Sequence, residues 1–291
     1  MTSLVKYNRR GYFLFMVAGL AAYTYVYIWS LANGVYYSFT DWNGFARTLN
    51  LVGLANYAKI FSNTRFLESL GFTLKYTALL TVVSSLLGLA LALVLNRQMK
   101  GRILFRALYF FPAILSAVTA GLIWNQIMYR VIPLIGQLIG SKALSTTILG
   151  DTKLAGFGVL FVHAWQFTPQ TFVLFLAGLQ AIPPDMPEAA MIDGANAVQV
   201  FRYITLPYLL PILEINTVLS LKYGFTVFDY IIAMTGGGPG GATESISVLI
   251  WKLGFAETRF AYACAMSVVM FIIIAAIAWF QLILIRRGEV Q

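Results

Sequence analysis

Apolar residues recur in six long stretches along the chain, and polar residues are mostly confined to the segments between them. The stretches cover residues 12–31, 70–95, 104–128, 154–179, 206–232 and 260–285. A helix of about 20 apolar residues is long enough to cross the hydrocarbon core of a bilayer. The pattern therefore predicts an all-α polytopic membrane protein, with six transmembrane helices in a single domain over residues 1–291.

The composition supports this class. Of 291 residues, 59% are hydrophobic and 11% are charged, whereas charged residues make up about 25% of a typical soluble domain. The segments between the apolar stretches are too short for a separate soluble domain of ordinary size. We therefore expect the whole chain to be built around its membrane crossings.

The net charge of +9 is concentrated at the ends of particular apolar stretches. Three clusters are formed by Lys6, Arg9 and Arg10, by Arg97, Lys100, Arg102 and Arg106, and by Arg286 and Arg287. Cytoplasmic loops of membrane proteins are rich in Lys and Arg. With six crossings the clusters share one side, which predicts cytoplasmic termini and a cytoplasmic loop over residues 180–207. This distribution indicates membrane lipid, and not nucleic acid, as a partner.

Residues 180–207 have the local signals of two short helices. Pro184 and Pro187 suit a first helical turn, Asp185 can cap it, and Glu188 complements the positive end of its dipole. Gly194 can end that helix in the left-handed conformation. Asn196 can then cap a second helix over residues 197–204, which Pro207 bounds.

The same segment carries the pattern Glu-Ala-Ala-x3-Gly-x9-Ile-x-Leu-Pro. Its residues are Glu188, Ala189, Ala190, Asp193, Gly194, Ile204, Leu206 and Pro207. This resembles the signature loop of inner-membrane permease subunits of binding-protein-dependent ABC importers. The resemblance implies that these residues form two short helices that dock into a groove on a cytoplasmic ATPase. The alternative interpretation is an ordinary loop between two membrane helices.

The resemblance also implies a set of partners. These are a second homologous permease subunit, two ATP-binding cassette subunits and an extracytoplasmic solute-binding protein. ATP and Mg would be bound by the ATPase subunits, because the chain carries no nucleotide-binding motif of its own. The expected role is that of a non-catalytic subunit in a bacterial or archaeal cytoplasmic membrane.

Two further segments are similar to the sugar-importing permeases of the maltose and glycerol-phosphate type. The first combines residues 38–42 with residues 52–57, and the second is the glycine-rich run 234–244. In the family the second element belongs to the first half of the permease pair. No strand precedes this run and no Gly-Lys-Ser/Thr follows it, so it does not fit a phosphate-binding loop.

Polar side chains within the fourth and fifth apolar stretches are candidates for a solute path. They are Trp165, Gln166, Gln170, Asn216, Ser220, Lys222, Tyr223 and Asp229. Polar groups inside a membrane either face a cavity or form hydrogen bonds between helices, and the sequence leaves both uses open. The single histidine, His163, has no Cys pair or carboxylate cluster nearby, so we expect it to pack or to line a cavity, with no metal site.

These observations favour an ABC permease for a sugar or oligosaccharide. The alternative is a permease of the same fold for glycerol phosphate, a polyamine or another small solute. A secondary transporter would be expected to show inverted repeats and discontinuous helices. A membrane enzyme would need an acid–base or metal constellation, and neither signature is evident in the sequence.

Overall fold

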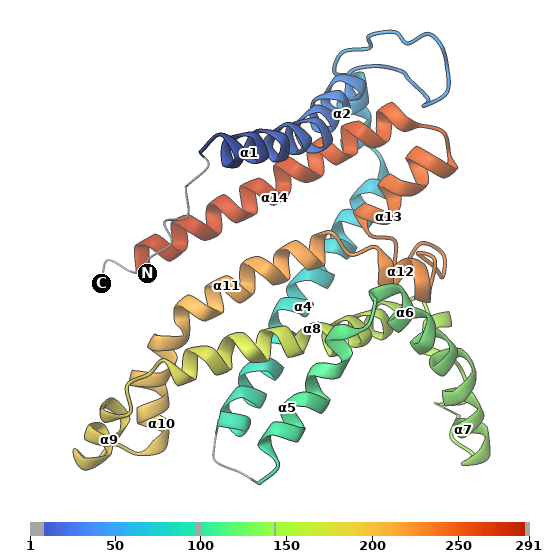
Figure 1. Cartoon of the computed structure of the whole chain (residues 1–291). Coiled ribbons are helices and arrows are strands. Elements are labelled where there is room, and N and C mark those ends of the chain that lie inside the picture. Colours follow the sequence, from blue (N-terminus) through green and yellow to red (C-terminus); the bar gives the residue numbers. More distant parts are fainter. Residues whose placement is uncertain (1–8, 97–99, 143, 289–291) are drawn as a thin grey trace. The chain divides into compact units, whose positions relative to one another are not determined.

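The structure is a computed structural model that describes residues 9–96, 100–142 and 144–288 (Figure 1). Regular structure in this part is helical, apart from one isolated bridge between Thr40 and Leu51. The helices are α1 (Arg9–Tyr23), α2 (Ser30–Ser38), α3 (Ala55–Phe61), α4 (Thr64–Asn96), α5 (Arg102–Phe110), α6 (Ala117–Gln126), α7 (Ile132–Leu138), α8 (Ala155–Gln180), α9 (Asp185–Ile192), α10 (Ala197–Val200), α11 (Leu206–Phe225), α12 (Asp229–Met234), α13 (Ile246–Trp251) and α14 (Phe260–Gly288).

Five of the described helical segments are long and apolar enough to cross a membrane. They are Tyr12–Ser38, Thr64–Asn96, Ala155–Gln180, Ala197–Phe225 and Phe260–Gln281. A sixth crossing arises if Leu104–Ile114 and Ala117–Leu138, which are bent by 95°, form one span. The predicted all-α, multi-pass class is confirmed.

Two compact units make up the chain. The first combines Met1–Asn63 with Ile250–Ile273, and the second combines Thr64–Leu249 with Ile274–Gln291.

Of the predicted basic clusters, Lys6 and Arg97 lie outside the described residues, as do the side chains of Arg9, Arg10, Arg286 and Arg287. Arg106 is described, and its guanidinium donates to the carbonyl oxygen of Leu95 (2.8 Å) near the end of α4.

Helices α4, α8 and α11 form the centre of the second unit (Figure 1). Helix α4 runs parallel to α8, because Tyr76 contacts His163 near one end while Gly88 contacts Thr171 further along. Helix α11 runs the opposite way, with Gly224 against Thr77. The two glycines let the backbones approach closely, as small residues commonly do between membrane helices.

Polar hydroxyl groups are buried between these helices while many large apolar side chains are exposed. Ser69, Thr73, Thr77 and Ser84 are buried on α4, whereas Leu86 and Val94 are exposed. Thr73 and Thr77 donate to carbonyl oxygens four residues earlier on the same helix (2.7 Å each), and the Thr73 hydroxyl also accepts from the backbone N–H of Ile246 (3.0 Å). Lipid solvates exposed apolar side chains, so close packing and hydrogen bonds determine what is buried.

The predicted stretch 104–128 is divided into two helices. Leu115 and Ser116 are extended between them, with ψ of 147° and 139°. Pro112, three residues before this break, has no N–H and its ring clashes with the carbonyl group four residues earlier in a continuous α-helix. The sequence pattern predicts the apolar character of both helices but not the bend between them.

The predicted stretch 206–232 also differs from the structure. Helix α11 ends at Phe225 and α12 begins at Asp229. The Thr226 hydroxyl donates to the carbonyl oxygen of Lys222 (2.8 Å), which satisfies an acceptor in the last turn of α11. Because of this break, Asp229 and Tyr230 lie at the start of α12 instead of along one continuous helix.

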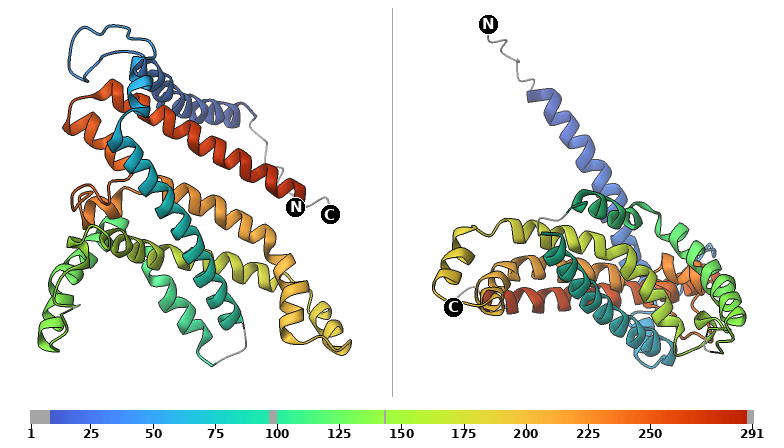
Figure 2. Two further views of the ribbon diagram at one scale, coloured as in Figure 1. Left: turned by 180° about the vertical axis from the view of Figure 1, so that it is seen from behind. Right: turned by 90° about the horizontal axis from the view of Figure 1, so that it is seen from below.

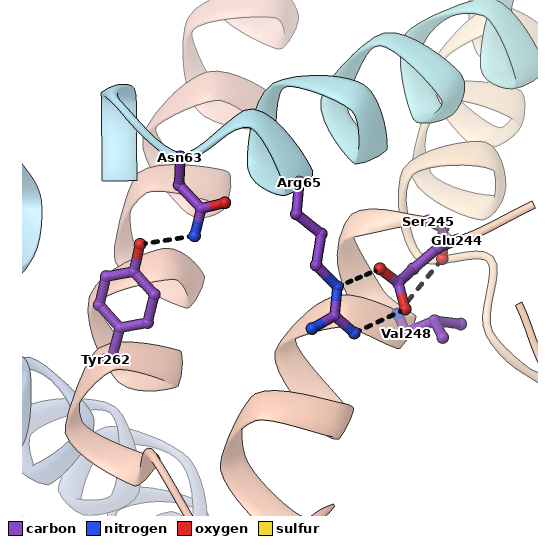
Figure 3. Close-up of polar contacts among 6 residues, drawn as sticks. All are labelled: Asn63, Arg65, Glu244, Ser245, Val248 and Tyr262. Atoms are coloured by element: carbon purple, nitrogen blue, oxygen red, sulfur yellow. Dashed lines mark hydrogen bonds and ion pairs between the residues drawn. The ribbon is translucent and has the colours of Figure 1, made fainter. Parts of the chain in front are cut away.

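In the first unit, the segments 38–42 and 52–57 form one folded loop. The Asn56 amide donates to the carbonyl oxygens of Ser38 (2.9 Å) and Thr40 (2.8 Å), and Asn63 donates to the Tyr262 hydroxyl (3.1 Å; Figure 3). Asp41 accepts hydrogen bonds from the backbone and side-chain N–H groups of Asn50, which lower the pKa of its carboxyl group. The motif residues thus stabilise the loop that contains them.

Candidate functional site

The segment that carries the signature pattern folds into a helical hairpin, defined here as residues 185–205 and called the α9–α10 hairpin. It lies at the end of α8 and α11 remote from α12 (Figures 1 and 2). Helix α9 begins after Pro184 without a side-chain cap. Asp185, which we expected to be the cap, lies in the first turn together with Glu188, where both carboxylates complement the helix dipole.

The turn of the hairpin depends on Gly194. Its φ is +89°, a conformation that strains residues with a side chain. The N–H of Gly194 donates to the carbonyl oxygen of Met191 (3.1 Å), and that of Ala195 to the carbonyl oxygen of Ala190 (2.9 Å). This pair of bonds is the Schellman arrangement that closes a helix C-terminus. The predicted left-handed glycine is confirmed.

Asn196 starts the second helix through a capping box. Its side-chain oxygen accepts from the N–H groups of Val198 (3.1 Å) and Gln199 (3.0 Å), while the Gln199 side chain accepts from the Asn196 N–H (2.7 Å). The predicted cap is confirmed. The helix does not stop before Pro207, however, because α10 continues through a π-helical turn (Phe201–Thr205) into α11. This wider π-helical turn ends two residues before Pro207, which has no backbone N–H to donate.

The α9–α10 hairpin exposes large apolar side chains beside charged and polar residues. Ile192 is 86% exposed, Val198 73% and Tyr203 70%. Glu188, Ala189, Asp193, Gly194 and Pro207 are exposed, Leu206 is 37% exposed, and Ala190 and Ile204 are partly buried. Exposed apolar patches with a polar rim commonly mark protein contacts. The local bonds therefore present a preformed surface suited to a protein partner.

A cavity of about 360 Å³ lies at the other end of the second unit. It is lined by Ala113, Leu115, Ala117, His163, Gln166, Phe167, Gln170, Tyr223, Thr226, Val227, Phe228, Asp229 and Tyr230. Four of the predicted path residues are among them, namely Gln166, Gln170, Tyr223 and Asp229. The lining combines amides, hydroxyls and one carboxylate with aromatic rings.

A chain of hydrogen bonds fixes the wall of this cavity. The Tyr230 hydroxyl donates to Gln166 Oε1 (2.8 Å), and Gln166 Nε2 donates to the carbonyl oxygen of Leu115 (2.5 Å). The His163 ring stacks on Tyr230 with centroids 4.3 Å apart, and its Nδ1 lies 3.0 Å from the Tyr76 hydroxyl. His163 is buried and also lines the cavity, as the sequence predicts.

The other predicted path residues lie elsewhere in this structure. Asn216 is wholly buried, accepting from the Thr171 hydroxyl (2.8 Å) and donating to the Ser85 hydroxyl (2.8 Å). Ser220 is also wholly buried. Trp165 packs edge-on against Trp124, and the Lys222 ammonium lies 5.5 Å from the centroid of the Tyr223 ring. Sequence reasoning does not identify Tyr230, although its position next to Asp229 is a usable signal.

The glycine-rich run after α12 forms a closed turn. The Thr243 hydroxyl donates to the carbonyl oxygen of Gly238 (2.6 Å) and lies 2.8 Å from the Thr235 hydroxyl. Glu244 is buried and forms two bonds with the Arg65 guanidinium, at 2.7 and 3.0 Å (Figure 3). These contacts fasten the turn to the start of α4.

Comparison with known proteins shows one consistent similarity. Residues 84–289 match the protein family described as "Binding-protein-dependent transport system inner membrane component". The chain is 37% identical to the multiple sugar-binding transport system permease protein MsmF of Streptococcus mutans, with 100% of both chains covered. It is 31% identical to AmyD of Thermoanaerobacterium thermosulfurigenes, a probable starch degradation products transport system permease protein, again with 100% of both chains covered. A chain of a bacterial ABC transporter involved in alginate import has the same fold, with a TM-score of 0.81, 21% identity and 96% coverage of each chain.

Proposed function

The chain belongs to the family of binding-protein-dependent transport system inner membrane components, and from that premise we propose that it carries a sugar or oligosaccharide across the membrane as one half of an ATP-driven importer. Its role is that of a non-catalytic permease subunit. The observation that carries the sugar assignment is the cavity lined by Gln166, Gln170, Tyr223 and Tyr230. Full-length relatives named for sugar and starch-product transport support it.

The chemistry of the cavity suits a neutral solute rich in hydroxyl groups. Amides offer both donors and acceptors to such a solute. Gln166 already uses both ends of its amide within the wall, whereas Gln170 is exposed at the cavity. The rings of Tyr223 and Phe167, with centroids 5.1 Å apart, provide an apolar surface for the carbon face of a sugar ring. We therefore assign solute contact to Gln170, Tyr223 and Asp229, and wall support to Gln166.

The partners follow from the family and from the α9–α10 hairpin. A second permease half, two ATP-binding cassette subunits and an external binding protein complete the transporter, and ATP and Mg are bound by the cassette subunits. The exposed apolar residues of the hairpin, with Glu188 at its first turn, dock on an ATPase subunit. This arrangement puts the hairpin and both chain termini in the cytoplasm of a bacterial or archaeal cell.

Uptake measurements test the assignment. Cells with and without the gene receive a panel of labelled solutes that contains malto-oligosaccharides, other di- and trisaccharides, glycerol phosphate and a polyamine. The expected result is gene-dependent uptake of a saccharide, with no ATP hydrolysis by the purified chain alone. Gene-dependent uptake of only glycerol phosphate or the polyamine would replace the sugar assignment, and ATP hydrolysis by the chain alone would overturn the subunit's role.

A substitution then tests the cavity. Gln170→Ala removes an exposed amide from the lining, so we expect lower saccharide uptake at an unchanged amount of folded protein. Gln137→Ala on α7 is the matched control, because this glutamine is exposed outside the cavity. Equal uptake by both variants would contradict the assigned path.

A further inference from the structure

A second cavity of the second unit lies between α4 and the start of α8. Its volume is about 220 Å³. It is lined by Phe72, Lys75, Tyr76, Leu79, Thr152, Lys153, Gly156, Phe157, Leu160 and Ala242. We call it the Lys75–Lys153 groove. The proposed solute path does not include it, and it shares no lining residue with the cavity around Gln170.

Two positive charges stand at this groove. Lys75 and Lys153 are both exposed, and neither forms an ion pair within the described part of the chain. The carboxylates closest in sequence to these lysines are Asp151 and Glu68. Asp151 accepts from the backbone N–H groups of Lys153 (2.7 Å) and Leu154 (3.1 Å), and Glu68 lines a neighbouring hollow that also includes Lys75. The groove therefore has two ammonium groups available to an anion.

Both lysines lie near the beginning of a predicted apolar stretch. Lys75 lies five residues inside the predicted apolar stretch 70–95, and Lys153 immediately precedes the stretch 154–179. Phe72 of α4 contacts Gly156 of α8, so Lys75 lies three residues after this contact along α4 and Lys153 three residues before it in the segment that leads into α8. A lysine in the outer part of a span can extend its long side chain to the interface of a bilayer, where lipid headgroups lie.

The remainder of the groove is apolar. Leu79 is 41% exposed and Phe157 57% exposed, and both lie further along their helices than the lysines. Leu160 and Phe72 complete the apolar side. Side chains of this kind are suited to an acyl chain and give no advantage to a small hydrated anion.

We propose that the Lys75–Lys153 groove binds one anionic phospholipid, with its phosphate between the two ammonium groups and an acyl chain along Leu79 and Phe157. Charge complementarity selects the headgroup, and the apolar wall selects a lipid over a free anion. An exposed ion pair between a lysine and the phosphate contributes up to about 1 kcal/mol, or about fivefold in affinity. Two such pairs are expected to favour anionic over zwitterionic lipid by up to about 25-fold.

The test uses the assembled transporter purified in detergent, with retained lipid counted by native mass spectrometry. Phosphatidylglycerol and phosphatidylcholine with identical acyl chains are the probes. We expect the wild type to retain phosphatidylglycerol preferentially and the double variant Lys75→Gln/Lys153→Gln to lose affinity by up to about 25-fold. The matched control is Lys59→Gln/Lys142→Gln, which removes two exposed lysines away from the groove and should leave retention unchanged.

Four results would overturn the proposal. Equal retention of the two lipids would remove the headgroup preference, and equal loss in both double variants would assign the effect to net charge. Displacement of phosphatidylglycerol by millimolar inorganic phosphate would identify a site for a soluble anion. A photoreactive group at Phe157 distinguishes lipid from protein, because cross-linking to lipid supports the proposal and cross-linking to the second permease subunit shows that a protein covers the groove.

Discussion

The α9–α10 hairpin and the interface between α4, α8 and α11 belong to the same unit but are held together in different ways. The hairpin's turn and cap use hydrogen bonds between residues no more than five positions apart. In the interface, Asn216 bonds to Thr171, 45 residues away, and to Ser85, 131 residues away. One region is specified by its local sequence, and the other exists only when distant helices meet.

The hairpin and the interface also differ in how far their side chains are exposed. Ile192, Val198 and Tyr203 of the hairpin are open to a partner, whereas Asn216, Gly224 and Thr77 have little or no exposed surface. A change in the hairpin should therefore reduce transport while the transmembrane helices stay folded. A change in the interface should reduce stability first, and transport only as a consequence.

The largest effect is expected from Gly88→Ala in the interface. The added methyl carbon would lie 2.5 Å from Thr171 Cγ2 and 3.1 Å from the backbone nitrogen of Phe172, so α4 and α8 must separate. Overpacking of this kind costs about 1–3 kcal/mol. Thermal unfolding of the purified transporter in detergent should show a clear loss of stability.

Gly71→Ala on the same helix is the matched control for this prediction. Nothing lies within 4 Å of its new methyl carbon, and alanine is the better helix former by about 1 kcal/mol. Its stability should be equal to or above that of the wild type. A similar loss in both variants would show that α4 is sensitive to any change and not to the close approach of α8.

The same contrast explains how much of the molecule is predictable from its sequence. Gly194 and the pair Asn196 and Gln199 define the turn and second helix through offsets of a few residues, so the hairpin can be predicted. The apolar stretches likewise predict the helical, multi-pass class, because their lengths match a bilayer. Pro207 is the exception, since the π-helical turn before it is not evident from the residue types.

The cavity is predictable only in part. Gln166 and Asn216 look alike in the sequence, as amides within apolar stretches, yet one lines the cavity and the other joins three helices. The rotation of each helix decides between these uses, and the hydropathy pattern does not define that rotation. Tyr230 is missed for a related reason, because it reaches the cavity only where α11 ends at Phe225.

Gly194→Val should have the second-largest effect, and it should alter transport and not overall stability. A left-handed backbone costs a residue with a side chain about 1–2 kcal/mol, and the φ of Gly194 is +89°. Because nothing lies within 4 Å of the added carbon, the strain is in the backbone alone. We expect saccharide uptake to fall about tenfold, as this strain corresponds to roughly 1.4 kcal/mol.

Gly194→Asn provides the comparison, because asparagine tolerates the left-handed region. It should retain most of the uptake, and both variants should unfold at the wild-type temperature. Normal uptake with Gly194→Val would show that the turn has no part in coupling to the ATPase. A lowered unfolding temperature would show that the hairpin supports the fold and is not an independent element.

A smaller loss of stability is expected from Asn216→Ala. The change removes bonds to Thr171 and Ser85, and side-chain hydrogen bonds between membrane helices contribute about 0.6–1.7 kcal/mol. Thr217→Ala is the control, because Thr217 donates only to the Leu213 carbonyl oxygen of its own helix. If the two variants unfold at the same temperature, the hydrogen bonds between helices contribute no more stability than a bond within one helix.

The smallest effect should come from Asn196→Ala, which removes the capping box of α10. Loss of such a cap costs about 0.5–1 kcal/mol. Helix α10 is exposed and four residues long, and it is otherwise held by the turn at Gly194 and by its continuation into α11. Amide hydrogen exchange at Val198 and Gln199 should accelerate a few-fold, with a modest decrease in uptake and no change in the unfolding of α4, α8 and α11. Asn196→Asp keeps an acceptor for both N–H groups and should restore slow exchange. Fast exchange in both variants would mean that the acceptor at residue 196 does not determine where α10 begins.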